Sequence, residues 1–150
     1  MVVVDGQGIP LGVHLDSASP AEVNLLEPTL ATIAVPRAGP GRPRQKPARV
    51  IADKAYDSDP LRGRLARRGI ELTPAPTAEQ VRVAPHRRNR KKPPTQDRRK
   101  LRRYRRRWKV ERTFSWLGNF RRLLVRWEHH LTMYLAFFHL ACLLITVRRL

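Results

Sequence analysis

The pattern of apolar and polar positions at the N-terminus predicts a β-hairpin. Residues 2–4 and 9–13 form two short runs rich in apolar and β-branched side chains, and residues 5–8 read Asp-Gly-Gln-Gly between them. Glycine permits the tight backbone turns that join antiparallel strands. We therefore expect two antiparallel strands joined by a turn at residues 5–8.

A helix is predicted after the hairpin. Ser19, Pro20 and Glu22 match the N-cap, N1 and N3 positions of a capping box, and the spacing of apolar residues extends the helix to about Val35. The next stretch, residues 36–47, has four prolines and two glycines and no apolar periodicity. We therefore expect it to be an exposed, flexible loop.

The middle of the chain has the pattern of a strand, a helix and a second strand. Residues 48–53 form a short apolar run that ends on an acid, Asp53. A helix can begin at Asp59 and close at Gly69, after which residues 70–72 resume a strand. Such a βαβ unit pairs its two strands in parallel.

The second half of the chain is expected to be helical after an initial loop. Residues 74–97 are proline-rich and increasingly basic, which predicts a flexible loop. From Arg98 the composition predicts one long helix to about Trp127, with a bend or break near Gly118-Asn119. A second helix should span about 131–148. It is very apolar but short for a bilayer span, so we interpret it as a buried core helix.

The net charge of the chain indicates which kind of partner it binds. The chain has 31 Lys and Arg against 12 Asp and Glu, a net charge of +19, and about half of the basic residues lie between Arg87 and Arg112. This imbalance argues against a metabolic enzyme with an acidic pocket and favours a polyanionic partner. The length of 150 residues indicates one domain. The single cysteine, Cys142, excludes an intrachain disulfide and is expected to be an inert, buried thiol.

Two acids are candidates for chemistry. Asp53 ends a predicted parallel strand, at the edge where open α/β sheets present functional groups, although an acid there is also typical of a turn or cap. Glu111 follows Tyr104 and Arg107 at a spacing that would place all three on one face of a continuous helix. Glu111 could equally form a surface ion pair with Arg107.

The sequence around both acids resembles that of DDE-type transposases. Residues 51–58, Ile-Ala-Asp-Lys-Ala-Tyr-Asp-Ser, together with Leu61-Arg62 and residues 68–70, closely resemble the second-aspartate region of those enzymes. The stretch that contains Tyr104, Arg107 and Glu111 is similar to the glutamate signature of the insertion sequence five family and its insertion sequence four relatives. The similarity continues through residues 112–118 and 120–123. With the hairpin and the first helix, the resemblance covers most of the chain.

The resemblance implies an RNase H-like fold in which two aspartates and a glutamate hold two divalent metal ions, usually Mg²⁺. Hard cations prefer oxygen ligands, and two of them can stabilise the attacking and leaving oxygens at phosphorus. Asp53 would be the second catalytic metal ligand and Glu111 the third. The residues expected to contact DNA are Tyr104, Arg107, Lys109, Arg112, Arg121 and Arg122.

The sequence departs from the family pattern at two places. The wider signature has a lysine seven residues after the glutamate, and that position is Gly118 here, so its phosphate contact would come from Arg121 or Arg122. The first catalytic aspartate of the family lies on a strand upstream of the hairpin. Asp5 matches a non-catalytic Asp-Gly of the family, and Asp16 does not replace the missing acid by pattern.

The expected fold class is therefore α/β. Residues 1–150 would form part of an RNase H-like domain, a mixed sheet with flanking helices that lacks its first strand and ends in two helices. We expect such a chain to be a truncated copy or a downstream reading frame, inactive by itself because the first aspartate is absent.

The basic segment, residues 87–109, is too dense in Arg and Lys for nearby acids to balance. We expect it to bind phosphates with little sequence preference and a steep salt dependence. Aromatic residues at helical spacing are interpreted as core rather than as base-stacking platforms: Trp108, Phe114, Trp116 and Trp127. The histidines lack cysteine partners, so a zinc site is not expected.

These observations predict DNA transposition as the function. The expected partners are the terminal inverted repeats and target DNA, with a second copy or an upstream-frame transposase product, in the bacterial cytoplasm at the nucleoid and away from membranes. One alternative is a non-catalytic basic DNA- or RNA-binding protein in which Asp53 and Glu111 are remnants. Another is a membrane-surface protein that uses its Arg-rich and apolar helices.

Overall fold

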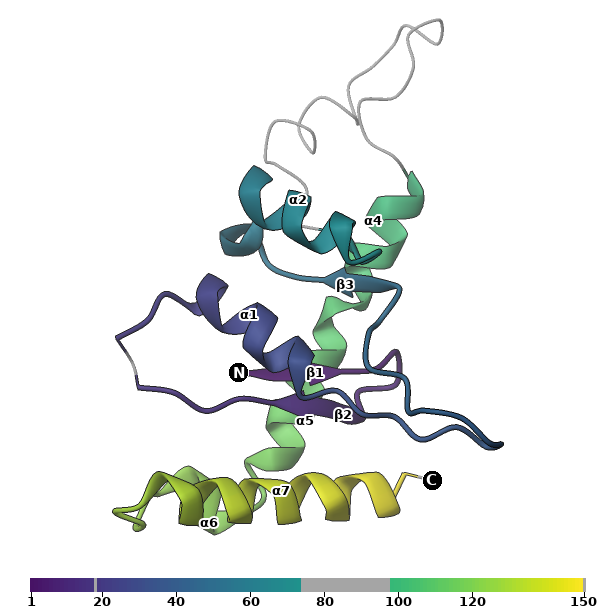
Figure 1. Ribbon diagram of the computed structural model, residues 1–150. Coiled ribbons are helices and arrows are strands. Elements are labelled where there is room, and N and C mark those ends of the chain that lie inside the picture. The colour runs from purple at the N-terminus through teal and green to yellow at the C-terminus, as the bar shows by residue number, and fades with distance from the viewer. Residues whose placement is uncertain (18, 74–97, 150) are drawn as a thin grey trace, which may run out of the picture. The chain divides into compact units, whose positions relative to one another are not determined.

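The computed structural model describes residues 1–17, 19–73 and 98–149 (Figure 1). The chain divides into two compact units. Unit 1 comprises Met1–Lys46 and Trp108–Leu150, and unit 2 comprises Pro47–Arg107. Each unit is described by itself. The predicted loop at residues 74–97 lies outside the described residues.

Unit 1 begins with the predicted hairpin. Strand β1 (Val2–Val4) pairs antiparallel with β2 (Pro10–Val13), and Val2 lies opposite Val13. Gly8 closes the turn with a φ of 87°, in the left-handed region that favours glycine. The hairpin prediction is confirmed.

Helix α1 (Glu22–Ala31) is shorter than predicted at both ends. The predicted capping box is wrong, because Ala21 occupies the N-cap position and no side chain caps the helix. Ser19 and Pro20 instead form a bend before it. The helix ends at Ala31, after which the Thr32 N–H bonds to the Thr29 carbonyl and the Ile33 N–H to the Leu30 carbonyl. Apolar spacing alone does not locate these ends, since Ile33 is buried although it lies beyond the helix.

Helix α1 packs closely on strand β2 because residue 12 is glycine. A Cβ atom at Gly12 would lie 2.9 Å from the Thr29 carbonyl oxygen and 2.8 Å from Thr32 Oγ1. Thr32 Oγ1 also accepts a hydrogen bond of 3.0 Å from the N–H of Val13. The predicted loop at residues 36–47 follows and is largely exposed. It contains one antiparallel bridge, between Val35 and Arg44.

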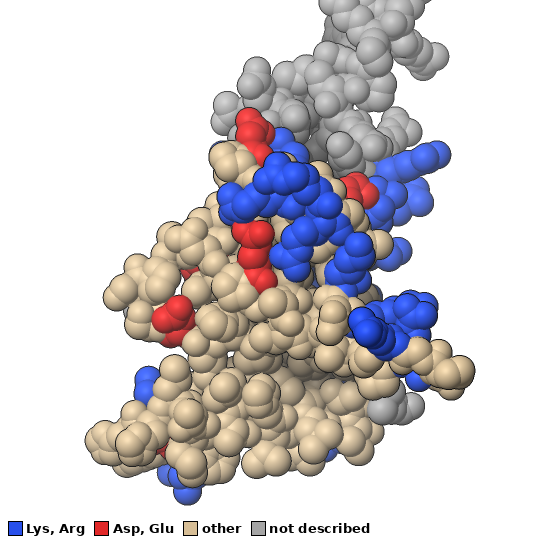
Figure 2. Space-filling view, viewed as in Figure 1, with Lys and Arg blue, Asp and Glu red and all other residues tan. Residues whose placement is uncertain are grey.

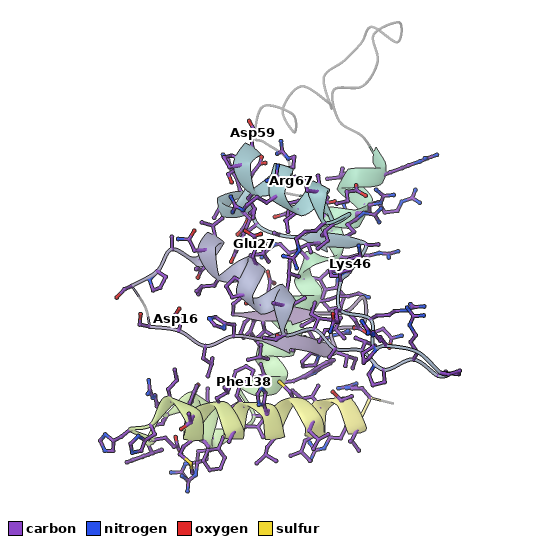
Figure 3. All side chains as sticks on the ribbon, viewed as in Figure 1. Asp16, Glu27, Lys46, Asp59, Arg67 and Phe138 are labelled. Atoms are coloured by element: carbon purple, nitrogen blue, oxygen red, sulfur yellow. The ribbon has the colours of Figure 1, made fainter. Side chains whose placement is uncertain are left out.

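Three helices complete unit 1: α5 (Trp108–Leu117), α6 (Arg121–Leu124) and α7 (Leu131–Val147). The break between α5 and α6 falls at the predicted Gly118-Asn119, and α7 spans the predicted segment. The core of this part of the unit comprises Leu117, Phe138, Ala141 and Ile145, with Val2 and Val13 of the hairpin packed against it. Figure 3 shows Phe138 on the side of α7 that faces the hairpin.

Helix α7 is buried along one side only, so its interpretation as a fully buried core helix is wrong. Six of its large apolar side chains are more than 40% exposed. The core assignment of the aromatic residues also fails for three of four: Trp108, Phe114 and Trp127 are half exposed or more, whereas Trp116 packs against the core. None of the helices in the described part of the chain has both the length and the hydropathy that a membrane span requires.

Unit 2 contains the predicted βαβ arrangement. Strand β3 (Arg49–Ile51) pairs in parallel with β4 (Glu71–Thr73). Helix α2 (Asp59–Arg67) connects them, and Gly69 follows it with a φ of 73°. Ser58 rather than Asp59 caps α2, since Ser58 Oγ accepts a hydrogen bond from the Leu61 N–H. The buried side chains of this unit include Val50, Leu61, Leu65, Ile70 and Leu72.

The long helix predicted from Arg98 is not continuous. Helix α4 (Arg98–Tyr104) ends in a 3₁₀ turn, η2 (Arg105–Arg107), and α5 begins at the next residue. A 3₁₀ turn winds three residues per turn instead of 3.6. Tyr104, Arg107 and Glu111 therefore lie in three successive segments, and the continuous helix on which their shared face was predicted is not formed.

The described strands form two separate two-stranded sheets, one in each unit. A mixed α/β architecture is therefore observed, as expected for a domain of this type. The single RNase H-like mixed sheet implied by the resemblance stays a prediction.

Candidate functional site

Asp53 lies just beyond the carboxyl end of strand β3, as predicted. It caps a 3₁₀ turn, η1 (Lys54–Tyr56), and its Oδ1 accepts a hydrogen bond of 2.7 Å from the Lys54 N–H. The side chain is exposed. The cap is the ordinary structural role for an acid at a strand end, and it holds the carboxylate at the edge of the sheet where a ligand could reach it.

The other N-terminal acids have local structural roles. Asp5 Oδ1 accepts hydrogen bonds from the Gln7 and Ile9 N–H groups, at 2.7 and 2.8 Å, and so organises the hairpin turn. Asp16 Oδ1 accepts a hydrogen bond from the Ser17 N–H. These contacts agree with the expectation that Asp5 does not replace the first catalytic acid.

Glu111 is exposed in the first turn of helix α5, which docks on the hairpin turn. Lys109 Nζ donates to the Gly6 carbonyl, and Arg112 Nη2 donates to the Gln7 carbonyl. The hydroxyl of Thr113, which is fully buried, lies 2.6 Å from the Gly8 carbonyl oxygen. Residues on both sides of Glu111 therefore fix its position relative to the hairpin.

Replacing Thr113 by valine should loosen this docking. Valine matches the shape of threonine but leaves the buried Gly8 carbonyl without the Thr113 donor, which costs about 1–3 kcal/mol of unfolding free energy. Urea unfolding of the Thr113→Val and Thr113→Ser variants measures the effect, and serine should restore most of the stability. Equal stability of the valine variant and the wild type would contradict the role of this contact.

Arg112 also lies among aromatic rings. Its guanidinium carbon is 4.9 Å from the ring centroids of both Trp108 and Trp116, and Arg149 lies 4.2 Å from the Trp116 centroid. Cation–π contacts of this kind fix the guanidinium plane. The proposed DNA contacts of Lys109 and Arg112 thus stay predictions, and the structure gives both side chains a second role in holding α5 to the hairpin.

The remaining predicted DNA contacts lie at the ends of short helices. Tyr104 is the last residue of α4 and Arg107 the last of η2, and both are half-buried in unit 2. Arg121 and Arg122, on α6, are exposed. With Trp127 they line a hollow of about 460 Å³. An exposed indole beside two guanidinium groups is chemically suited to a nucleotide, whose base can stack and whose phosphate can pair with arginine.

Arg122 is also bonded to an acid in the same region. Its Nη1 donates a hydrogen bond of 2.9 Å to Glu128 Oε1, and this bond holds the pKa of the Glu128 carboxyl below its ordinary value. The Glu128 side chain is 8% exposed. Arg126 reinforces the turn through a bond of 3.0 Å from Nε to the Glu128 carbonyl. The segment between α6 and α7 is therefore held in place by arginines.

Sequence reasoning missed a group of basic residues on α2. Figure 2 shows Lys and Arg side chains gathered over α2 and α4, which both belong to unit 2. On α2 the buried Leu61 and Leu65 occupy one face. Basic residues occupy exposed positions on the helix and at its C-cap: Arg62, Arg64, Arg67 and Arg68. The amphipathic pattern of α2 could have indicated these residues, but the denser charge after residue 87 drew the prediction to that segment. Arg62 is partly neutralised, since it pairs with Asp57 and Asp59.

The candidate acids have the chemistry to bind a divalent metal ion, but there are too few of them together to hold one. Carboxylate oxygens such as those of Asp53 and Glu111 are the donors that Mg²⁺ prefers. These two acids belong to different units. The described part of the chain contains no group of three or more His, Cys, Asp or Glu side chains that could hold a metal ion. The described residues therefore do not form a metal site by themselves.

Cys142 is a half-buried free thiol in α7. Burial raises its pKa to about 11, so the thiol stays protonated at neutral pH and is a poor nucleophile. The prediction of an inert cysteine is consistent with this pKa.

Known proteins resemble this chain over most of its length. The putative transposase for insertion sequence element IS402 of Burkholderia cepacia is 37% identical over 151 residues, which cover 99% of this chain and 63% of the relative. The putative transposase for insertion sequence element IS6501 of Brucella ovis is 38% identical over 99 residues, which cover 66% of this chain and 67% of the relative. The chain thus spans less than two thirds of the length of the first relative. No solved structure matches.

A family model described as the transposase DDE domain matches residues 1–146. Its range includes both candidate acids, the hairpin and nearly all of α7. Both relatives described above are named as putative transposases of insertion sequence elements. We conclude that this chain belongs to the DDE transposase domain family.

Proposed function

We propose that this chain is part of the catalytic domain of an insertion-sequence transposase of the insertion sequence five family and acts in DNA transposition. The observation that carries the proposal is the family match over residues 1–146. The positions of Asp53 after a parallel strand and Glu111 on an exposed helix turn support it. In this proposal Asp53 is the second acidic residue of the family's catalytic triad and Glu111 is the third.

The basic residues of the chain would bind and orient the DNA. Exposed arginines on α4 and η2 pair with phosphates, and Arg121 and Arg122 offer a second contact at the hollow beside Trp127. Tyr104 and Arg107 would lie near the cleaved phosphate, as in the family signature. Mg²⁺, when bound by the complete set of acids, would stabilise charge on the attacking and leaving oxygens. The expected substrates are the terminal inverted repeats and target DNA at the bacterial nucleoid.

Residues 1–150 should bind DNA without cutting or joining it. Only two of the three acids of the family have candidates here, and two metal ions need the third as a shared ligand. Incubation of the purified chain with supercoiled plasmid and Mg²⁺ should leave the plasmid closed, while a gel shift reports binding. The matched variants are Asp53→Ala, Glu111→Gln and, as a control acid on α2, Asp59→Ala.

Two outcomes would contradict this proposal in different ways. Mg²⁺-dependent nicking that Asp53→Ala and Glu111→Gln abolish and Asp59→Ala preserves would show that the chain is active by itself. A chain that does not shift DNA at low salt would remove the DNA-binding role.

A second candidate function is a non-catalytic DNA- or RNA-binding protein that retains the transposase fold. It is favoured by the lack of a three-acid group in the described part of the chain. The two candidate functions predict different results when a first aspartate is supplied. A longer version of the chain that supplies a first aspartate should nick DNA if Asp53 and Glu111 are functional, and should only bind it if they are remnants.

A further inference from the structure

Residues 125–130 join α6 to α7 in unit 1 (Figure 1) and contain one acid, Glu128. The Glu128 side chain is only 8% exposed, although the rest of this segment lies on the surface. Arg122 Nη1 donates to Glu128 Oε1, whereas Oε2 is buried and finds no hydrogen-bond partner within the described part of the chain. The fold therefore buries a carboxylate beneath an exposed segment, with an arginine as its partner.

Stability alone does not explain this buried acid. The cost of removing two charges from water offsets much of their attraction, so an apolar pair of similar size is often equally stable. A buried oxygen without a hydrogen bond adds a further cost. The Arg122 side chain, in contrast, is 61% exposed. The exposure of the arginine indicates that the bond serves the arginine rather than the core.

The contacts of Arg122 orient its guanidinium group at the hollow that it lines with Arg121 and Trp127. Besides the bond to Glu128, the guanidinium carbon lies 5.1 Å from the centroid of the Phe137 ring on α7. Arginine has five N–H donors, and the bond to Glu128 uses Nη1. The edge formed by Nε and Nη2 can therefore bind two oxygens of a phosphate in parallel.

The backbone at Glu128 is itself held in place. Arg126 Nε donates a hydrogen bond of 3.0 Å to the Glu128 carbonyl, and its Nη2 donates one of 3.4 Å to the His129 carbonyl. The Arg126 guanidinium carbon lies 5.7 Å from the Tyr134 ring centroid. The Tyr134 hydroxyl donates a hydrogen bond of 3.1 Å to the Leu123 carbonyl of α6. These contacts tie the acid to both helices and make its carboxylate a fixed acceptor.

We propose that Glu128 is a positioning residue, whose buried carboxylate orients the Arg122 guanidinium at the hollow for binding a DNA phosphate. The inference rests on the proposed DNA-binding function and adds a residue that acts through one of its arginines. A long side chain loses rotamer freedom when it binds a ligand, and a guanidinium that is already held loses less. Arg121 lines the same hollow and serves as an internal comparison.

Charge and orientation predict different effects of substitutions at Glu128. Glu128→Gln and Glu128→Ala remove the same negative charge, but glutamine keeps an oxygen that can accept a hydrogen bond from Arg122. The alanine variant should therefore bind duplex DNA about fivefold more weakly than the glutamine variant, from the ordering of one long side chain. Glu128→Asp keeps the charge and shortens the side chain. It should bind about fivefold more weakly than the wild type for the same reason.

A double-mutant cycle separates positioning from folding. Fluorescence anisotropy with a labelled duplex should show Arg122→Gln binding about eightfold more weakly than the wild type at about 0.1 M salt, from the loss of one phosphate contact. In the Arg122→Gln background the difference between the alanine and glutamine variants of Glu128 should vanish. In an Arg121→Gln background it should persist in full. A general loss of structure in the segment would instead leave a difference in the Arg122→Gln background as well.

A control variant and a measurement without DNA complete the experiment. Asp59→Asn removes the same charge from an acid of unit 2 that also bonds to an arginine, since Arg62 Nη1 lies 2.9 Å from Asp59 Oδ1. This control should not weaken DNA binding. The NMR order parameter of the Arg122 Nε–H group should lie above about 0.6 in the wild type and below it in Glu128→Ala.

The outcomes separate this inference from the proposed function. Equal affinities of Glu128→Ala and Glu128→Gln, or a difference that survives in the Arg122→Gln background, would overturn the inference. If the alanine variant does not fold, Glu128→Asp decides, and binding as tight as that of the wild type would overturn it. A wild type that binds DNA no better than Arg122→Gln does would overturn the inference and leave DNA binding to α4 and η2. A wild type that does not bind DNA would overturn both.

Discussion

Replacing Arg102, Arg105 and Arg106 together with glutamine should lower the affinity of the chain for duplex DNA about 500-fold at 0.1 M salt. All three side chains are exposed, on α4 and η2. Each phosphate contact adds about 0.9 to the slope of log affinity against log salt concentration, so three lost contacts should reduce that slope by about 2.7. Fluorescence anisotropy with a labelled duplex, at several salt concentrations, measures both quantities.

The matched control removes the same charge elsewhere. Arg37, Arg42 and Arg44 are exposed in the loop at residues 36–47, and their replacement by glutamine also lowers the net charge by three. This control should retain most of the affinity and of the salt slope. Equal losses in the two variants would mean that DNA responds to net charge alone. An unchanged affinity in the first variant would remove α4 and η2 from the DNA-binding surface.

Replacing Leu65 by alanine should destabilise unit 2 by about 2–5 kcal/mol. Leu65 is fully buried on the face of α2 that packs on the parallel strands, and truncation leaves a cavity there. Asp53 follows strand β3 of the same unit, so the edge that presents it should lose order as well. Hydrogen exchange of the Ala52 and Glu71 amides, which bond to the Thr73 and Ala48 carbonyls, measures the opening of the strand pair.

The control for Leu65 lies on the same helix. Arg67 is exposed, and its replacement by alanine should change the stability by less than about 0.5 kcal/mol. Protection of the Ala52 and Glu71 amides should then match the wild type. If Leu65→Ala left their protection unchanged, the buried face of α2 would not be what holds the two strands in place.

Local turn chemistry made the hairpin and the βαβ unit predictable from the sequence. An Asp-Gly-Gln-Gly turn and a glycine after α2 specify backbone geometry within a few residues, and the structure follows them at Gly8 and Gly69. The start of α1 was mispredicted although Ser19, Pro20 and Glu22 fit a capping box, because Ala21 takes the N-cap position and no side chain caps the helix. Residues 105–107 form a 3₁₀ turn although all three are arginines, which favour α-helix in isolation.

Only part of the candidate site could be predicted from the sequence. The sequence identifies Asp53 and Glu111 by their neighbours, and the structure puts both side chains in exposed positions. It could not indicate that Lys109 and Arg112 donate to backbone carbonyls of the hairpin turn, because a carbonyl and a phosphate attract the same donors. Hydropathy likewise could not reveal which side of α7 is covered, since both sides are apolar.

The discontinuity of unit 1 has a consequence for the synthesis of the chain. Gln7 and Arg112, which are bonded, are 105 residues apart in sequence, whereas unit 2 is continuous from Pro47 to Arg107. At about 5–20 residues per second, a ribosome takes about 5–20 s to reach Arg112 after Gln7. The hairpin and α1 can therefore complete their packing only after α5 and α7 have been synthesised. Helix α2 and its two strands can assemble before that.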